Sequence, residues 1–240
     1  MISVTNLDST NGSVSGDPQF VGLRGQPFQV HGIDGAVYNL ISGHDYQLNA
    51  RFAFLHGPRA CPSMPSSQST ACWNHPGSYL SEIGLKIAPL KRYTTSAFVR
   101  PELELYVAAG PASEGFTDIT LNGRTMDIWA GPLDMFVSTY GNVAFILNST
   151  HELLLVFDEW TIEIENSDMF LNFRSIRIAT ESWSSLRTHG LIGQTWSNKR
   201  HKGSISAIEG EVDDYVIMEE SVFGDSFLFN QYGSAPETPI

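Results

Sequence analysis

Short runs of alternating apolar and polar residues constrain this chain more than any other feature of its sequence. From Leu48 to Phe54 every second side chain is apolar, and Asn49 and Arg51 lie between them. A period of two is typical of a β-strand with one buried face and one face in water. We therefore expect Leu48 and Phe54 to face a core and Asn49 and Arg51 to face solvent.

The same alternation recurs along most of the chain. It is found in segments 82–87, 102–107, 126–129, 142–147, 160–165, 169–173 and 175–178. Gly, Pro, Asn and Asp are frequent between these segments, and turns require these residues. Strands at such spacing, with no convincing helical window, predict an all-β fold: an antiparallel β-sandwich or barrel-like sheets with long loops.

The opening of the chain is unusually rich in turn formers. Residues 16–42 contain five glycines and two prolines among bulky apolar residues, so a hairpin is expected here. No internal repeat or sharp change of composition divides residues 16–230, which are predicted to form a single domain. Residues 1–15 and 231–240 are interpreted as a flexible N-terminal tail and a C-terminal tail that the core does not need.

The charge balance bears on partners and location. The chain has 26 acidic and 14 basic residues and a net charge of −12, which repels phosphate backbones and anionic lipids. Nucleic acid is therefore not expected as a partner. The longest strongly apolar run, 153–157, is far shorter than the roughly 20 residues of a membrane-spanning helix, so no membrane insertion is expected.

A low charged fraction of 17% with many Ser, Thr, Asn and Gly residues is commoner in extracellular β proteins than in cytosolic helical ones. We therefore expect an extracellular or secreted protein. The first 16 residues have neither the basic start nor the apolar stretch of a signal peptide. Either the signal peptide was removed from this numbering, or the protein is not secreted by that route.

The two cysteines, Cys61 and Cys72, flank a Pro- and Ser-rich stretch that has almost nothing to bury. A disulfide between them is predicted, and closing a loop of this size contributes about 3 kcal/mol in the chain-entropy description. Two free thiols are the alternative. Zinc is not expected, because His75 alone does not supply the two further ligands that a zinc site needs.

Two distant motifs resemble the von Willebrand factor type D domain. Residues 16–20 (GDPQF) resemble the opening turn of that family, and 189–198 (HGLIGQTWSN) resemble its late signature, with Ile192 where the signature has a cysteine. Residues 211–216 (EVDDYV) resemble the acidic pair that comes after the signature. The resemblance implies an extracellular β module of adhesion, gels, matrices or assembly without catalytic chemistry, in which the two motifs lie close together.

The same resemblance raises the question of calcium, because oxygen ligands in these turns bind the ion in the family. Asn198, Asp213 and Asp214 are the candidate ligands that remain here, whereas Gln194 and Trp196 replace two of the family's residues. The basic residues of 198–202 oppose a cation. A solvated acidic turn is the alternative, and no other cofactor is expected.

An enzymatic interpretation rests on Glu159, Glu163 and Glu165, whose even spacing puts them on one face of a strand. Glycoside hydrolysis uses such pairs of carboxyl groups. The segment resembles the catalytic strand of laminarinase-type glycosidases, but Thr161 and Glu163 are the wrong groups at two of its positions. The alternative, which we favour, is a solvent-facing stripe whose intervening side chains face the core. Those side chains are Trp160, Ile162 and Ile164.

Two tryptophans and two asparagines are candidate residues for sugar binding and for glycosylation, respectively. Trp73 and Trp196 are the tryptophans that could stack on a sugar, as in carbohydrate-binding modules. Asn11 and Asn148 begin N-glycosylation triplets, the second in an expected hairpin turn.

We expect a non-catalytic extracellular structural or adhesive module of a matrix, coat or self-assembled polymer, with other protein copies or matrix proteins as partners. A carbohydrate-binding or carbohydrate-cleaving β-sandwich is the alternative. Self-association into fibres through strand edges is a third interpretation.

Overall fold

The computed structural model describes residues 11–54, 77–89, 102–126, 143–157, 159–179, 188–196 and 208–233. Its strands join one 14-stranded sheet in which every pairing of neighbouring strands is antiparallel, so the predicted all-β fold is confirmed. The strands are β1 (Asn11–Ser15), β2 (Gln19–Val21), β3 (Pro27–Gln29), β4 (Val37–Gly43), β5 (Tyr46–Phe54), β6 (Ser78–Ile87), β7 (Leu103–Ala108), β8 (Asp118–Leu121), β9 (Arg124–Thr125), β10 (Val143–Ser149), β11 (Glu152–Phe157), β12 (Trp160–Ser167), β13 (Phe170–Ile178) and β14 (Val216–Ile217).

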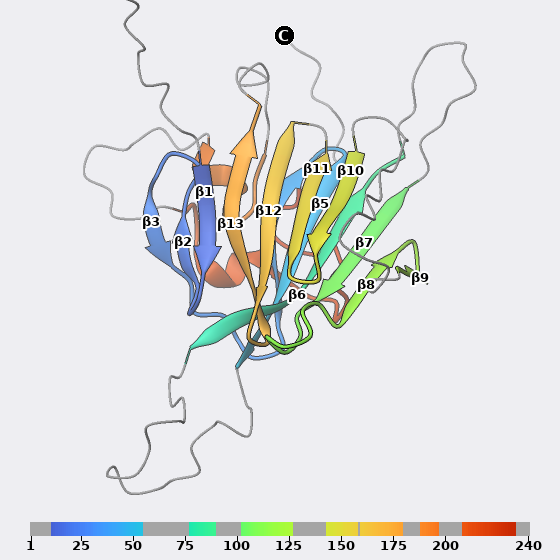
Figure 1. Cartoon of the computed structure of the whole chain (residues 1–240). Coiled ribbons are helices and arrows are strands. Elements are labelled where there is room, and N and C mark those ends of the chain that lie inside the picture. The colour runs from blue at the N-terminus through green and yellow to red at the C-terminus, as the bar shows by residue number, and fades with distance from the viewer. Residues whose placement is uncertain are drawn as a thin grey trace, which may run out of the picture.

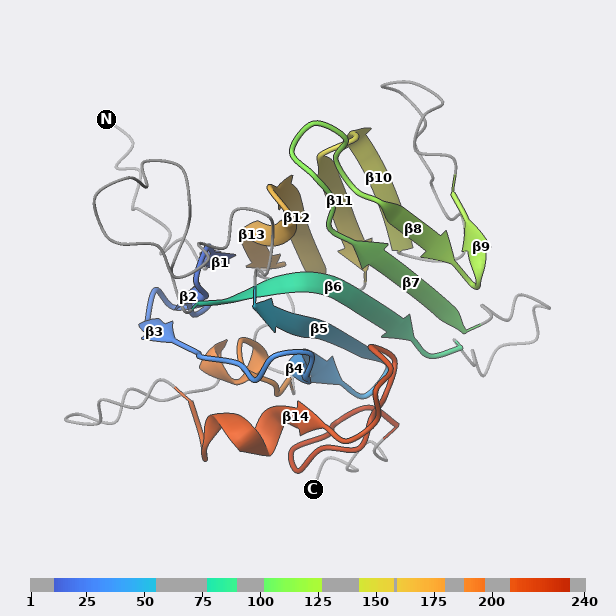
Figure 2. The same cartoon turned by 90° about the horizontal axis from the view of Figure 1, so that it is seen from below.

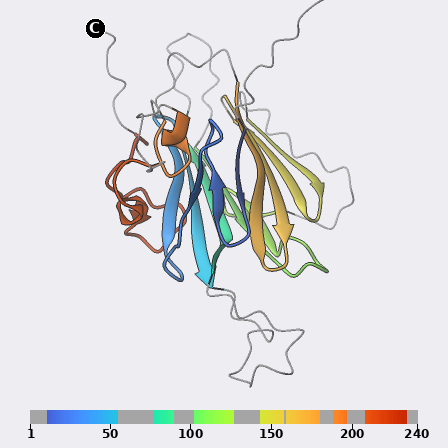
Figure 3. The ribbon, with the colours of Figure 1, turned by 90° about the vertical axis from the view of Figure 1, so that its left-hand side faces the viewer.

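The sheet curls into two layers that face each other (Figures 1 and 3). One layer runs in the order β14-β4-β5-β6-β7-β8-β9, and the other runs β10-β11-β12-β13-β1-β2-β3. They meet where Leu171 of β13 pairs with Leu80 of β6, while the far half of β6 pairs with β7 instead. The two layers are therefore parts of one folded sheet, a half-barrel.

The core lies between the layers, and alternation selects the residues that enter it. On β12 the side chains of Trp160, Ile162 and Ile164 are buried, as predicted, and the residues between them are half-buried. β7 shows the same alternation, with Leu103, Leu105 and Val107 buried. Segments 169–173 and 175–178, expected as two strands, form the single strand β13.

The opening hairpin is confirmed. Gly16 has a φ of 60° in the turn that joins β1 to β2, and Gly25 has a φ of 76° in the turn that joins β2 to β3. Glycine adopts these left-handed conformations without the steric cost that a Cβ atom brings. Phe20 of β2 stacks on Phe28 of β3 with ring centroids 5.0 Å apart.

Residues 208–233, here called the covering segment, lie over the outer face of the layer that contains β4 and β5 (Figures 2 and 3). They contain the short 3-10 helix η3 (Val212–Tyr215) and β14. A second apolar cluster forms beneath them, with Val37 of β4 against Ile217, Val222 and Phe227. Every residue of β4 is buried because both of its faces are covered.

The prediction that Asn49 faces solvent is therefore wrong. Its side chain is 0% exposed under the covering segment, whereas Phe54, expected in the core, is 39% exposed at the end of β5. Arg51 is half-buried. Alternation identified the core face of β5 at Leu48, Ala50 and Phe52, but it gave no sign that the opposite face is covered as well.

The predicted tails, residues 1–15 and 231–240, include residues that belong to the fold. Residues 11–15 form β1, which pairs with β13 and β2 and buries Val14. At the other end the backbone N–H of Gly233 donates to the carbonyl of His44, and Lys86 lies over the ring of Tyr232. Pairing and burial of this kind make both segments part of the fold. The assignment of residues 16–230 to a single domain stays a prediction.

Several sequence predictions fall outside the described residues. Cys61 and Cys72, Trp73, Asn198 and most of segment 126–129 belong to this group. Within the part of the chain that the structure describes, no helix is both long and apolar enough to cross a bilayer.

Candidate functional site

The outer edge of β4 is closed by two segments from the far end of the chain. His189 forms a β-bridge with Ser42, and the N–H groups of Leu191 and Ile192 donate to the carbonyls of Asn39 and Leu40 at 3.1 and 2.9 Å. β14 pairs with the first residues of β4. Backbone groups of a strand edge that would otherwise be open are thus bonded.

The first of these segments also binds the opening hairpin. The N–H of Leu23 donates to Thr195 Oγ1 at 2.8 Å, and Gln26 Nε2 donates to the Thr195 carbonyl at 2.9 Å. The late GLIGQTW segment therefore binds the turn after β2, at Leu23 and Gln26, and the expected proximity to residues 16–20 (GDPQF) themselves stays a prediction.

Trp196 does not offer a free face to a sugar. It is only 5% exposed, and the guanidinium of Arg24 lies 5.0 Å from its ring centroid. The prediction of a sugar-stacking Trp196 is wrong, because the turn packs this ring into the core. Trp73, the other candidate, lies outside the described residues.

A polar and aromatic cluster connects 188–196 to η3. Gln194 Nε2 donates to Tyr215 Oη at 2.7 Å, and Tyr215 Oη donates to the Glu209 carbonyl at 2.7 Å. The ring of His189 stacks on Tyr215 and on Phe229, with centroid distances of 5.8 and 4.7 Å. Burial raises the pKa of Tyr215 well above its ordinary value, and the hydrogen bond from Gln194 partly opposes this shift.

His189 is the titratable group at the centre of this cluster. Its Nε2 lies 3.5 Å from a carboxylate oxygen of Glu209, and its Nδ1 is buried without a hydrogen-bond partner. Burial lowers the pKa of His189 below 6.5, and the Glu209 carboxylate opposes the shift. The neutral imidazole is therefore the form that this stack favours near pH 7.

The predicted calcium ligands are only partly placed. Asp214 accepts a hydrogen bond from the N–H of Glu211 at 2.8 Å and so caps η3, whereas Asp213 is exposed. Asn198 lies outside the described residues. Among the residues that are described, no three His, Cys, Asp or Glu side chains gather closely enough to hold a metal ion. The calcium site stays a prediction.

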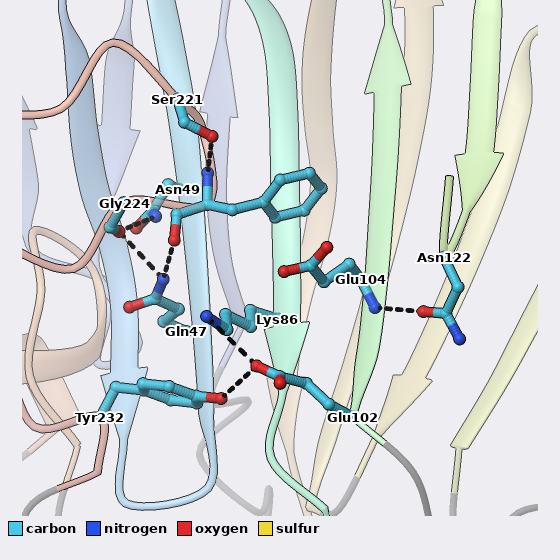
Figure 4. Close-up of polar contacts among 10 residues, drawn as sticks. Gln47, Asn49, Lys86, Glu102, Glu104, Asn122, Ser221, Gly224 and Tyr232 are labelled. Atoms are coloured by element: carbon cyan, nitrogen blue, oxygen red, sulfur yellow. Dashed lines mark hydrogen bonds and ion pairs between the residues drawn. The ribbon is translucent and has the colours of Figure 1, made fainter. Parts of the chain in front are cut away.

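The outer face of β5 binds the covering segment through side-chain amides (Figure 4). Asn49 Nδ2 donates to the carbonyls of Val222 and Gly224 at 2.8 and 3.0 Å. Gln47 Nε2 donates to the carbonyls of Phe223 and Gly224 at 3.1 and 2.9 Å. Sequence reasoning missed this attachment, because polar residues at alternate positions are also what a wet strand face contains.

The attachment continues along the neighbouring strands. Arg51 Nη2 donates to the Glu220 carbonyl at 2.6 Å, and its Nε lies 2.8 Å from Glu82. Tyr232 Oη donates to Glu102 at 3.2 Å, and Glu102 also pairs with Lys86 at 3.1 Å (Figure 4). The covering segment is therefore fixed to the sheet in its middle and at its C-terminal end.

The glutamates of β12 face arginines of β13. Glu163 pairs with Arg177, and Glu165 lies 3.8 Å from Arg174, which also pairs at 3.1 Å with Glu152 on β11. All five side chains are partly exposed. Glu159 lies before the strand, where it accepts a hydrogen bond from Tyr46 at 3.3 Å. The arrangement forms a charged stripe along the outside of one layer.

Both sequon asparagines are on the surface. Asn148 is exposed near the end of β10, two residues before the turn that leads into β11 and not in the turn itself, where it was expected. Asn11 is exposed at the start of β1, and its Oδ1 accepts a hydrogen bond from Ser175.

Comparison of the chain with protein-family models and with curated proteins finds no match in either set. The function of this protein is therefore inferred from its own residues and their contacts.

Proposed function

We propose that this protein is a non-catalytic structural or adhesive module of an extracellular assembly, such as a matrix, a coat or a self-assembled polymer. The observation that carries the proposal is the pairing of Glu163 and Glu165 with Arg177 and Arg174. Hydrolysis of a glycosidic bond needs two carboxyl groups directed at one sugar. Here the two best candidates are directed at cations of the next strand.

Other polar groups that could act on a substrate are also used to hold the fold. The amides of Gln47, Asn49 and Gln194 and the hydroxyl groups of Thr195 and Tyr215 all bond to other parts of the chain. Sequence resemblance to the type D domain and the low charged fraction of 17% support an extracellular location. In this role the partners are other protein copies or matrix proteins.

Immunogold electron microscopy of thin sections through cells that produce the protein tests this proposal, because sections give the antibody access to both the cell interior and the exterior. We expect label on extracellular fibres, coats or matrix. Label confined to the cell interior would overturn the extracellular role. Release of reducing ends from β-glucan by the purified protein, abolished by Glu163→Gln, would instead establish an enzyme.

A disulfide between Cys61 and Cys72 is part of the same proposal, because an oxidising compartment permits it. Intact mass after alkylation without reductant should show no labelled thiol. Two labelled thiols would contradict the disulfide and would remove one argument for an oxidising, extracellular compartment.

A further inference from the structure

The covering segment has an outward face that is both apolar and acidic. Met218 is 83% exposed and Leu228 is 70% exposed, which makes them the most exposed large hydrophobic side chains of the described residues. Their neighbours Ile217 and Phe227 point inward and are buried in the second apolar cluster. The two exposed side chains are therefore not simply part of a loosely packed segment.

Backbone hydrogen bonds hold Met218 and Leu228 near each other. The N–H of Met218 donates to the carbonyl of Ser226, and the N–H of Leu228 donates to the carbonyl of Asp214. Residues 214–218 and 226–228 thus run side by side in opposite directions. Met218 is therefore bonded to a residue two positions from Leu228, so the two exposed residues lie close together on the covering segment, while Ile217 and Phe227 are buried.

This surface is acidic without internal compensation. Residues 208–233 contain seven Asp and Glu residues and no Lys, Arg or His. Within the described part of the chain, none of Glu211, Asp213, Glu220 and Asp225 has an ion pair with a basic side chain. The carboxylate of Glu219 accepts hydrogen bonds from Ser226, and these bonds lower the pKa of Glu219, so it stays ionised in mildly acidic solution.

We propose that the face formed by Met218 and Leu228 is a docking site for a basic segment of another protein that carries apolar side chains. Exposed apolar residues within a charged rim are typical of protein interaction sites. The seven acidic residues of the covering segment favour Lys and Arg in the partner. A second copy that docked through this same face would bring the same carboxylates to it, so this face favours a basic partner over a second copy.

The covering segment is suited to present such a site. Gln47, Asn49 and Arg51 fix its backbone to the sheet, so the site is held in one conformation before a partner arrives. A preformed surface avoids part of the entropic cost of binding. This inference goes beyond the proposed function and does not depend on where the protein acts.

Fluorescence anisotropy with a labelled peptide of alternating lysine and leucine tests the docking site on the full chain. Met218→Ser combined with Leu228→Ser should weaken binding roughly tenfold. The matched control, Ile33→Ser combined with Met169→Ser, removes two exposed hydrophobic side chains elsewhere and should leave binding unchanged. Equal losses in the two double variants would overturn the site.

Charge is tested separately with Glu220→Lys against Glu114→Lys, which change the net charge equally at exposed positions. Only Glu220→Lys should weaken binding strongly.

The chemistry of the partner is tested with other peptides. A peptide of alternating glutamate and leucine, or of lysine and serine, should bind at least roughly tenfold more weakly than the lysine and leucine peptide. Equal binding of either peptide would contradict the proposed chemistry. Self-association that Met218→Ser and Leu228→Ser abolish would replace the foreign partner with a second copy.

Discussion

Gly190 lies where the late segment passes closest to β4. Its φ is 98°, and a Cβ atom here would lie 2.4 Å from Asn39 Oδ1 and 2.6 Å from the backbone of Leu40. Gly25 also has a positive φ, of 76°, but a Cβ atom there would meet nothing within 4 Å. A substitution at Gly25 therefore changes only the backbone strain, whereas a substitution at Gly190 adds a steric clash to the same kind of strain.

We expect Gly190→Ala to lower the free energy of unfolding by at least about 3 kcal/mol, because backbone atoms of β4 cannot move aside. Gly25→Ala carries only the conformational cost, about 1 kcal/mol. Urea denaturation of both variants measures the difference. Equal losses would show that the late segment does not pack against β4 as described.

His189 gives the fold a pH dependence whose sign follows from burial. Its pKa is lower in the folded protein than in the unfolded chain, so the unfolded chain binds the proton more readily. The contribution of His189 to stability is complete above its unfolded pKa of 6.5 and is lost as the pH falls through the lower folded value.

His189→Phe keeps an aromatic ring in the stack and removes the titration. Between about pH 7 and pH 5 the stability of the wild type should therefore fall more steeply than that of His189→Phe. Thermal unfolding at a series of pH values measures both slopes. Parallel slopes would mean that the imidazole is protonated as easily in the folded state as in the unfolded chain.

Among the elements, the covering segment is the one whose place depends most on a few side chains. Asn49→Ala removes donors to Val222 and Gly224 and the acceptor for Asn39 Nδ2, all in a buried region. The buried groups of Asn39, Val222 and Gly224 that lose these hydrogen bonds should lower the free energy of unfolding by about 2 to 4 kcal/mol.

Asn148→Ala is the matched control for this variant, because Asn148 is exposed, and it should change stability by less than ~0.5 kcal/mol. Hydrogen exchange should also show faster exchange in residues 216–228 of Asn49→Ala than in the wild type. Unchanged exchange there would contradict the role of Asn49 in fixing the segment.

Strands whose apolar residues recur with a period of two could be predicted from the sequence. Elements without such a period could not be predicted. The stripe of Trp160, Ile162 and Ile164 identified β12 and its buried face, as the structure confirms. The covering segment has one short 3-10 helix, a two-residue strand and otherwise irregular backbone, so no periodicity marks it. Its bonds join residues such as Asn49 and Val222, 173 positions apart, and local sequence carries no sign of such a pairing.

The candidate site around residues 188–196 could be predicted only in part from the sequence. The two motifs predicted that residues 16–20 and 190–196 lie close together, and Thr195 of the second motif contacts Leu23 and Gln26, just after the first motif. The burial of Trp196 could not be predicted, because a tryptophan beside glycine looks the same in an exposed turn and in a packed one. The aromatic stack on His189 was missed for a similar reason, since its partners Tyr215 and Phe229 come from separate turns.

For the molecule as a whole, both ends of the described chain are tied to the same sheet. β1 pairs with β13, the loop after β2 binds Thr195, and residues 216–233 bind β4, β5 and the turn at His44. We therefore expect one cooperative unfolding transition, with tryptophan fluorescence and far-UV circular dichroism coincident in urea. A protease-stable fragment that lacks residues 1–80 would contradict this prediction and the single domain.

The closure of β4 by the last residues of the fold also sets an order of events during synthesis. Asn49 and its partner Val222 are 173 residues apart, and a ribosome that adds about 5 to 20 residues each second needs roughly 9 to 35 seconds to make the intervening chain. Throughout that time Asn49 has no carbonyl of Val222 to bind, and for most of it, until residues 189–192 and 216–217 have been made, the outer edge of β4 is unpaired. The nascent chain is therefore exposed to pairing with other strands just when many copies emerge close together on one messenger RNA.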